Sequence, residues 1–340
     1  MKILVTGTNG FIGVMMGAYL RDHGHEVTGI DTGFYTDGWL YDGITPIEHT
    51  IRKDIRNIEP DDLAGFDAVV HLAELSNDPL GKLKPTITYE INHQGSVRLA
   101  EMCKQAGVQR FVYASSCSVY GLGSDDYKTE ESTVNPLTAY AECKVLVERD
   151  VSALADDDFT PTFLRNATAY GASPRIRFDV VVNNLSGMAW TQKKIALTSD
   201  GRPWRPLVHV LDICQAFLRV LEAPREVVHR QIFNVGDTRE NYRVVEIARL
   251  VADTFPGCEL TVGQSDQDDR SYRVSFDKIQ RVLPDFVCQW TAQKGAEELH
   301  QRFEQIAMDA DTFEFRAFTR LKQLQHLIAT NQIDDHFYWV

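Results

Sequence analysis

Apolar runs alternate with segments of helical periodicity along the first half of the chain. The first two runs end at Thr6 and Asp31, and three more lie in "DAVVHLA", "RFVYASS" and "TPTFLRN". Between them, apolar residues recur on one face of a helix, as in Phe11 to Leu20. Strands that alternate with helices predict an α/β protein with a doubly wound parallel sheet. The continuous apolar run from Ala68 to Leu72 indicates strands that helices cover on both faces.

The alternation of strands and helices loosens from about residue 170 onward. There "GASPRIRFDVVVNNL" and "TSDGRPWRPLVHV" mix Gly, Pro and Arg with apolar residues, which predicts a smaller C-terminal α/β lobe. We expect residues 1–170 to form the sheet domain, with residues 209–237 returning to it. The second lobe is then formed by 171–208 and 238–300, and residues 301–340 form a helical tail that covers this lobe.

The composition is that of an ordinary globular protein. Of 340 residues, 44% are apolar and 24% are charged, which is enough for a sizeable core. No run approaches the roughly 18 apolar residues of a membrane span, and the chain opens on a strand rather than a secretory signal. We therefore expect a cytoplasmic protein without a membrane anchor. The formal net charge of −13 argues against nucleic acid as a partner but allows a small basic pocket for phosphates.

The cysteines indicate neither disulfides nor a metal site. They are scattered, with no C-x-x-C pair and no Cys/His cluster at the spacing of metal ligands. We interpret them as reduced thiols. The six are Cys103, Cys117, Cys143, Cys214, Cys258 and Cys288.

A glycine-rich turn follows the first predicted strand. In "MKILVTGTNGFIG", Gly7, Gly10 and Gly13 stand at the spacing G-x-x-G-x-x-G and open the first predicted helix. Glycines allow a tight turn, a close approach of a diphosphate to the backbone and close packing of helix on strand. The helix N-terminus adds unpaired N–H groups and the positive end of a dipole. Glycine is common in turns, but this position favours a dinucleotide-binding turn.

Asp31 ends the second predicted strand, 18 residues after Gly13. A carboxylate there can accept the ribose hydroxyls of an adenosine, and it would repel a 2′-phosphate, so NAD is favoured over NADP. The alternative is that Asp31 is a plain turn residue before Thr32 and Gly33.

Candidate catalytic residues follow in "YASSCSVYG" and "YAECK". Tyr140 and Lys144 lie four residues apart in a segment that is typical of a helix, so their side chains share one face. A nearby ammonium favours a phenolate, which makes the tyrosine a candidate general base for a sugar hydroxyl. Ser116, at the end of a predicted strand, is placed to hydrogen-bond the same oxygen. Alone, the pattern Y-x-x-x-K is expected on the order of once by chance among 12 tyrosines.

Simpler interpretations exist for several of these residues. Ser116 can be a turn or helix-cap hydroxyl, because "SSCS" is polar throughout. Cys117 beside it has no evident His and acid partners for a nucleophilic role. His71 and His209 stand in apolar strand contexts, which favours packed structural residues over acid/base groups.

Together these residues resemble a known group, the extended short-chain dehydrogenase/reductases that act on nucleotide sugars, and particularly the sugar 4-epimerases. The matching segments occur in the order typical of the group and cover about 280 residues. They are "TGTNGFIG", "GID" ending at Asp31, "DI" at Asp54, "HLAE" from His71, "INHQGS" with Asn92, "SSCSVYG", "YAECK", "VVNNL", "RPLVHV", "FNVG" from Phe233 and "DDRSYRV".

The resemblance implies a Rossmann domain for NAD, a C-terminal lobe that binds the nucleotide sugar, and the catalytic set Ser116, Tyr140 and Lys144. For the cofactor it implies Gly7, Gly10, Phe11, Ile12, Gly13, Asp31, Asp54, Ile55, Leu72, Ala73, Glu74, Asn92, Ser115, Tyr140, Lys144 and Asn166. For the substrate it implies Ser116, Tyr140, Thr168, Asn184, Leu185, Arg205 and Arg270. The two arginines would neutralise the substrate's diphosphate, for which guanidinium forks are suited, although solvated surface charges are the alternative.

Two departures from the group bear on the reaction. Thr168 stands where many relatives carry Asn, which changes a polar contact to the substrate. Cys117 and Ser118 stand where relatives that perform 4,6-dehydration place Asp-Glu, which disfavours a dehydratase.

We therefore predict an NAD-dependent epimerase that acts, at C4, on a UDP- or dTDP-hexose through a transient 4-keto sugar. The alternatives are a reductase of a 4-keto-6-deoxy nucleotide sugar and a non-catalytic nucleotide sensor. The resemblance also implies a homodimer, formed by the helix near residues 88–107 and the helix that carries Tyr140, although their apolar faces fit packing within the chain too.

Overall fold

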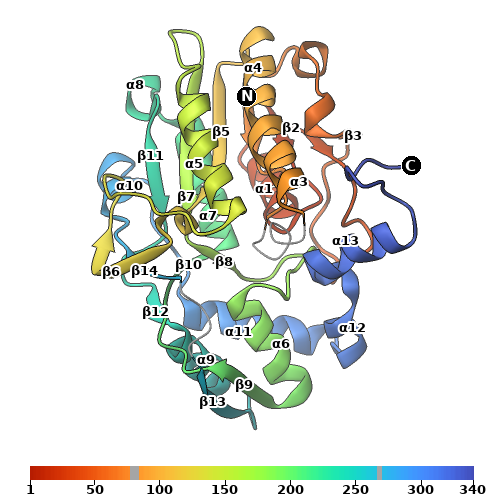
Figure 1. Cartoon of the computed structure of the whole chain (residues 1–340), viewed down its shortest axis with the longest axis vertical. Helices are drawn as coiled ribbons and strands as arrows, with labels where there is room; N and C mark the ends of the chain where they lie inside the picture. Colours follow the sequence, from red (N-terminus) through yellow and green to blue (C-terminus); the bar gives the residue numbers. More distant parts are fainter. Residues whose placement is uncertain (77–83, 266–269) are drawn as a thin grey trace.

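The computed structural model of the chain describes residues 1–76, 84–265 and 270–340 (Figure 1). The strands are β1 Lys2–Thr6, β2 Glu26–Asp31, β3 Thr50–Arg52, β4 Ala68–His71, β5 Arg110–Ser116, β6 Leu122–Lys128, β7 Thr160–Asn166, β8 Thr168–Tyr170, β9 Lys194–Ser199, β10 Trp204–His209, β11 Ile232–Val235, β12 Asn241–Arg243, β13 Glu259–Ser265 and β14 Ser271–Val274. The helices are α1 Phe11–Asp22, α3 Pro85–Thr88, α4 Ser96–Gln105, α5 Ala139–Ser152, α6 Val181–Gln192, α7 Val210–Glu222, α8 Arg225–Val228, α9 Val244–Thr254, α10 Asp277–Val282, α11 Ala292–Gln305, α12 Ala310–Glu314 and α13 Arg320–Ala329.

The main sheet has seven strands in the order β11-β7-β5-β4-β1-β2-β3, and every pairing in it is parallel. Side chains along β1 alternate between two apolar layers, because Ile3 and Val5 join the layer with α1 and α7 while Leu4 joins the layer with α4 and α5. The sheet is therefore buried on both faces. The predicted doubly wound parallel sheet is confirmed.

Helices cover the two faces in the manner that parallel crossovers require. On one face α1 packs against α7, and on the other α4 and α5 lie side by side (Figure 1). A π-helical segment, Tyr89–Gly95, joins α3 to α4. Thr138 caps the start of α5 by accepting a hydrogen bond from the backbone N–H of Ala141. The helix therefore begins at Ala139, one residue before Tyr140.

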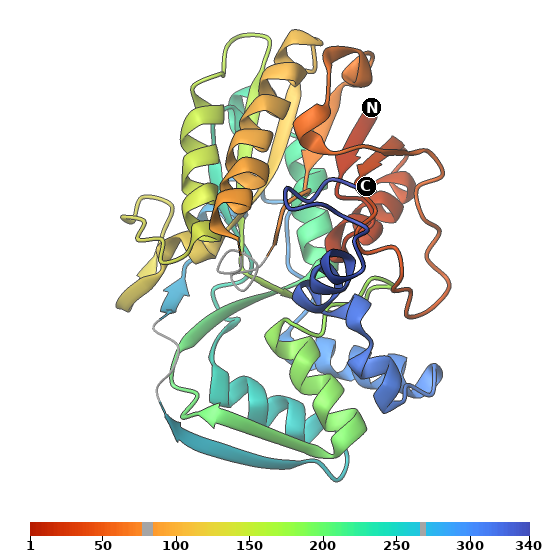
Figure 2. The same ribbon diagram turned by 45° about the vertical axis from the view of Figure 1, so that its right-hand side comes forward.

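A smaller lobe lies below the carboxyl ends of the main strands (Figure 2). Its core is formed by α6, α9 and α11, with Val182, Ile247 and Phe303 fully buried between them. The parallel pair β9–β13 flanks these helices. The short sheet β12-β10-β8 links the two lobes, because β8 follows β7 after a single residue.

The C-terminal segment reaches from the second lobe back to the edge of the main sheet (Figure 2). Phe318 packs in the core of the second lobe, whereas Leu324 and Phe337 pack in the core under α4. Helix α13 ends at Ala329, and the indole N–H of Trp339 then donates to the carbonyl of Thr32 at 2.7 Å. The tail thus contacts both lobes, where we expected it to cover the second lobe. None of the described helices has the length and apolar character of a membrane span.

Candidate active site

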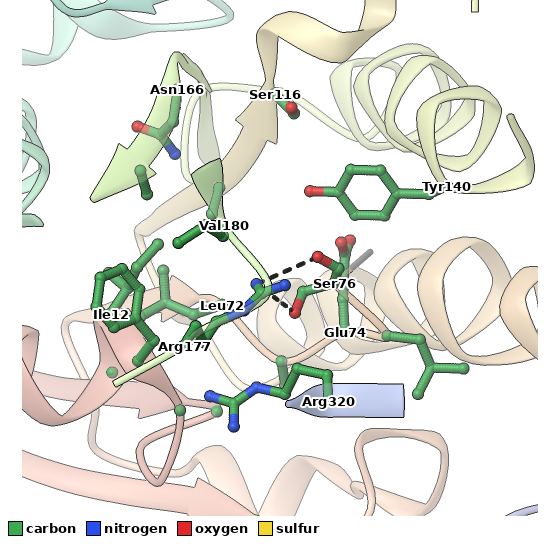
Figure 3. A pocket seen from close by; sticks show the side chains of 18 of the residues that line it. Ile12, Leu72, Glu74, Ser76, Ser116, Tyr140, Asn166, Arg177, Val180 and Arg320 are labelled. Atoms are coloured by element: carbon green, nitrogen blue, oxygen red, sulfur yellow. Dashed lines mark hydrogen bonds between the residues drawn. The ribbon is translucent and has the colours of Figure 1, made fainter. Parts of the chain in front are cut away.

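A cavity of about 710 Å³ opens at the carboxyl ends of β1, β2, β4 and β5, between the sheet and the second lobe. In Figure 3, Ser116, Tyr140 and Asn166 lie on one side of this space and Arg177 and Arg320 on another. The residues that we predicted for cofactor, substrate or catalysis and that line it are Gly7, Gly10, Phe11, Ile12, Gly13, Asp31, Asp54, Ile55, Leu72, Ala73, Glu74, Ser115, Ser116, Tyr140, Lys144, Asn166, Thr168, Asn184, Arg205 and Arg270.

Two predicted residues are not among the described residues that line the cavity. Asn92 is fully buried and exchanges two hydrogen bonds with the backbone of Leu75, at 2.8 and 3.0 Å. It therefore fixes the loop that follows β4, which does line the cavity. Leu185 packs in the core of the second lobe, one residue after the cavity-lining Asn184.

The glycine positions of the turn leave little room for a side chain. A Cβ on Gly13 would stand 2.0 Å from the carbonyl oxygen of Gly7, and one on Gly10 would stand 3.1 Å from the same atom. Gly7 also has a φ of +75°, which L side chains rarely adopt. Helix α1 begins at Phe11 without a side-chain cap, and its first three residues line the cavity, so its N-terminus is suited to an anion there. This geometry fits the diphosphate of a dinucleotide.

The carboxylate of Asp31 is held at the end of β2 by two backbone donors. The N–H of Asn9 lies 2.9 Å from one oxygen, and the N–H of Gly33 lies 2.7 Å from the other. Burial raises the pKa of Asp31, which the two backbone hydrogen bonds oppose. Asp54 lines the same end of the cavity and caps the short helix that begins at Ile55. These positions fit an adenosine between β2 and β3.

The three predicted catalytic residues lie on two neighbouring elements. Ser116 ends β5, and its Oγ accepts a hydrogen bond from the backbone N–H of Ser118 at 3.1 Å, so it is also a helix cap. Tyr140 and Lys144 lie one turn apart on α5, with the ammonium 5.2 Å from the centre of the phenol ring. The phenol projects into the space that Ser116 faces (Figure 3).

Lys144 also pairs with a carboxylate from another element. Its ammonium contacts Glu74 and the carbonyl of Ala114, and Glu74 in turn accepts a hydrogen bond from the hydroxyl of Tyr113. Burial acts to lower the pKa of Lys144, but the charges of Glu74 and Tyr140 outweigh it and raise the pKa. Lys144 is therefore a charged donor at neutral pH.

A buried network holds Ser115 and Cys117, the two residues that flank Ser116. The guanidinium of Arg165 on β7 donates to both oxygens of Glu148 on α5, at 2.9 and 2.7 Å. Glu148 also accepts a hydrogen bond from Ser115 at 2.5 Å. The thiol of Cys117 donates to the carbonyl of Arg165, and burial raises its pKa well above the usual range. Cys117 is thus a packed thiol without the thiolate character of a nucleophile.

The two histidines in strands lie in packed, hydrogen-bonded settings. His71 is fully buried between the hydroxyls of Thr6 and Ser96, at 2.7 and 2.8 Å, and burial lowers its pKa to about 3. His209 lies 3.0 Å from Glu298 and stacks on Trp290 at 3.9 Å between ring centres.

The sequence did not point to three further residues on the cavity wall. Arg177 donates to Asp179 and, at 3.1 Å, to the hydroxyl of Ser76. Tyr35 and Arg320 stack on each other at 4.0 Å, on the side of Asp31. The arginines of "SPRIRFD" were a visible signal for Arg177, whereas nothing local marks Arg320, which lies 289 positions after Asp31.

Comparison with known proteins agrees with this geometry. A model of the NAD dependent epimerase/dehydratase family matches residues 3–236. A UDP-glucose 4-epimerase of Corynebacterium glutamicum is 29% identical over 268 residues, covering 74% of this chain and 80% of that protein. A UDP-glucose 4-epimerase of Bacillus subtilis is 25% identical over 333 residues, covering 88% and 94%. The structure of MoeE5 in complex with UDP-glucose and NAD superposes with a TM-score of 0.77, at 27% identity, over 91% of this chain and 100% of that one.

Proposed function

This chain belongs to the NAD dependent epimerase/dehydratase family, and on that premise we propose that it epimerises C4 of a nucleoside-diphosphate hexose. The observation that carries the proposal is the meeting of Ser116, Tyr140 and Lys144 in one cavity with the glycine turn and with Asn184, Arg205 and Arg270. The UDP-glucose in the MoeE5 complex and the names of the UDP-glucose 4-epimerases favour UDP as the nucleotide, and dTDP remains within the proposal.

One end of the cavity is suited to the cofactor and the other to the nucleotide sugar. The glycine turn, Asp31 and Asp54 would hold NAD, with Lys144 near its nicotinamide end. Asn184 and the guanidinium forks of Arg205 and Arg270 would hold the substrate's diphosphate. The sugar then lies between these ends, beside Tyr140.

Epimerisation at C4 requires that the sugar 4-hydroxyl loses its proton while C4 loses a hydride. NAD held by the glycine turn and Asp31 would supply the acceptor, and then the donor, of the hydride at C4. Tyr140, as a phenolate, takes the hydroxyl proton while Lys144 stabilises its negative charge. The hydroxyl of Ser116 orients the same oxygen. When the 4-keto sugar has turned over in the cavity, Tyr140 gives the proton back to the carbonyl oxygen, which becomes the new 4-hydroxyl as hydride returns to C4.

Dehydration would need a different set of groups beside the tyrosine. At the two positions after Ser116, Cys117 donates to a backbone carbonyl and Ser118 carries a neutral hydroxyl. Neither is an acid or base suited to removing water across two sugar carbons.

The test is to incubate the purified protein with UDP-, dTDP- and GDP-hexoses without added cofactor and to separate the products. Interconversion of a pair of C4 epimers without accumulation of NADH supports the proposal. If no hexose is converted although NAD is released on denaturation, the next substrates to test are nucleotide-linked 4-keto-6-deoxy sugars with added NADH. A single reduction of such a sugar would contradict epimerisation and would show that the protein is a reductase.

A further inference from the structure

Arg320 is a buried cation on the cavity wall that comes from outside the region matched by the family model. It is the first residue of α13, whereas that match ends at residue 236. The residue is 3% exposed, and its guanidinium carbon lies over the ring of Tyr35, 4.0 Å from the ring centre. Figure 3 shows the guanidinium extending along the cavity below Arg177. The C-terminal segment therefore places a positive charge beside the cofactor end of the cavity.

The guanidinium of Arg320 has no acceptor within the described part of the chain. The backbone N–H of this residue donates to Asp179 at 3.4 Å, but no hydrogen bond or ion pair of its side chain is formed there. Its nitrogens are not among the fully buried side-chain atoms that lack a partner, so they are accessible from the cavity that Arg320 lines. A charged group in such a setting is normally paired with a group of opposite charge. Burial and the nearby Arg177 lower the pKa of Arg320 to about 10, so it stays charged at neutral pH.

The neighbouring arginines are already engaged by the protein. Arg175 donates to the backbone carbonyls of Tyr35, Thr36 and Gly38. Arg177 is held by Asp179 and Ser76. Arg320 lines the cavity, as Arg177 does and Arg175 does not, but within the described residues no acceptor of this chain engages its guanidinium.

We propose that Arg320 donates its guanidinium fork to the diphosphate of the bound dinucleotide. The helix N-terminus of α1 and Arg320 would then hold the two phosphates from different walls of the cavity. Planar guanidinium groups match phosphate oxygens in geometry and carry the charge that a diphosphate needs. Asp31, at the same end, is suited to the ribose hydroxyls and would repel a phosphate.

This inference rests on the NAD dependence of the family and not on C4 epimerisation, so each can fail without the other. The cavity also contains a second candidate diphosphate, that of the nucleotide sugar, near Arg205 and Arg270. The test must therefore separate the two ligands. ADP-ribose carries the dinucleotide's diphosphate without nicotinamide, and UDP carries that of the proposed substrate.

The experiment is calorimetric titration of the full-length protein and its Arg320→Gln variant with ADP-ribose and with UDP. We expect the variant to bind ADP-ribose about 10- to 100-fold more weakly, since hydrogen bonds to charged groups are the strong ones. We expect its affinity for UDP to stay within about twofold. Arg320→Lys keeps the charge and the aliphatic stem without the fork, and we expect about a tenfold loss for ADP-ribose.

Arg316→Gln is the matched control. Arg316 lies in the same segment and pairs with Asp37 at 2.6 Å, and it is not among the described residues that line the cavity. We expect the control to bind ADP-ribose as the wild type does. Unchanged ADP-ribose affinity in both Arg320 variants would overturn the proposal. An equal loss of affinity for UDP in the Arg320 variants would also overturn it, because Arg320 would then bind the substrate. An equal loss of ADP-ribose affinity in Arg316→Gln would overturn it as well, because the effect would then come from docking of the tail.

Discussion

Lys144 and Glu74 form an ion pair in the wall of the cavity, with side chains that are only 4% and 3% exposed. They come from α5 and from the loop after β4, and Tyr113 donates to the second oxygen of the carboxylate. Opposite charges this close largely cancel, so the positive potential that Lys144 exerts on Tyr140 is reduced. Glu74 is thereby placed to set the pH at which the proposed base becomes active.

Replacing Glu74 by glutamine tests this relationship. The amide keeps the size and a hydrogen bond to Tyr113 but removes the negative charge, which favours the phenolate. We expect the acidic limb of the pH profile of kcat/KM to move down by roughly one pH unit. Glu142→Gln, on the exposed side of α5, removes a charge from the same helix and should leave the profile unchanged. A profile that does not move in Glu74→Gln contradicts the role given to the ion pair.

Tyr140→Phe removes the proposed base and keeps the ring. General base catalysis contributes roughly 10²- to 10⁴-fold, so we expect kcat to fall by that factor. Binding of UDP and of ADP-ribose should be retained, because the ring and its contact with Lys144 remain. Retained kcat would exclude Tyr140 as the base, and lost binding would make its role structural.

Gly13→Ala probes the cofactor turn. The added Cβ would meet the carbonyl of Gly7 at 2.0 Å, where backbone on both sides cannot yield without distortion. We expect a loss of about 1–3 kcal/mol in the free energy of unfolding, together with weaker binding of ADP-ribose. Gly24→Ala is the control, since Gly24 has a φ of +84° but open space around it. It should lose about 1 kcal/mol through strain alone and bind ADP-ribose normally. Equal affinities in the two variants would contradict a dinucleotide at this turn.

The parts of the site that spacing and periodicity predicted share one property: their geometry is local, whereas Asn184, Arg205 and Arg270 were assigned through the resemblance alone. The glycine spacing, the strand end at Asp31 and the helical spacing of Tyr140 and Lys144 are set within a few residues of chain. The contacts of Glu74 with Lys144 and of Arg320 with Tyr35 join segments that are far apart in the sequence. They depend on the order of the strands in the sheet and on where the C-terminal segment packs. Periodicity carries no information about such pairs.

Asn92 and Leu185 were predicted for the site but are not among the described residues that line the cavity. A resemblance places a residue in a motif but does not say whether its side chain lines the cavity or supports a residue that does. Asn92 lies on the π-helical segment and holds the backbone of Leu75, and Leu185 lies on the inner face of α6. Which of two adjacent residues faces a cavity is decided by the packing of the whole helix.

His71 makes the fold sensitive to acid, and the sign of this effect follows from its pKa. Burial lowers the pKa of His71 to about 3, whereas an unfolded histidine titrates near 6.5. Between these values the unfolded chain binds a proton that the folded chain excludes, so lowering the pH favours unfolding by about 1.4 kcal/mol per pH unit. His71→Gln can keep hydrogen bonds to Thr6 and Ser96 and cannot titrate. We expect it to be less stable than the wild type at pH 7.

The difference in free energy of unfolding between wild type and His71→Gln should then shrink as the pH falls below about 6, by up to about 1.4 kcal/mol per pH unit. Urea titrations of both proteins between pH 7 and pH 4 measure it directly, and the common contributions of other titrating groups cancel in the difference. A constant difference for His71→Gln would mean that His71 accepts a proton in the folded state, which its two hydroxyl neighbours and complete burial argue against.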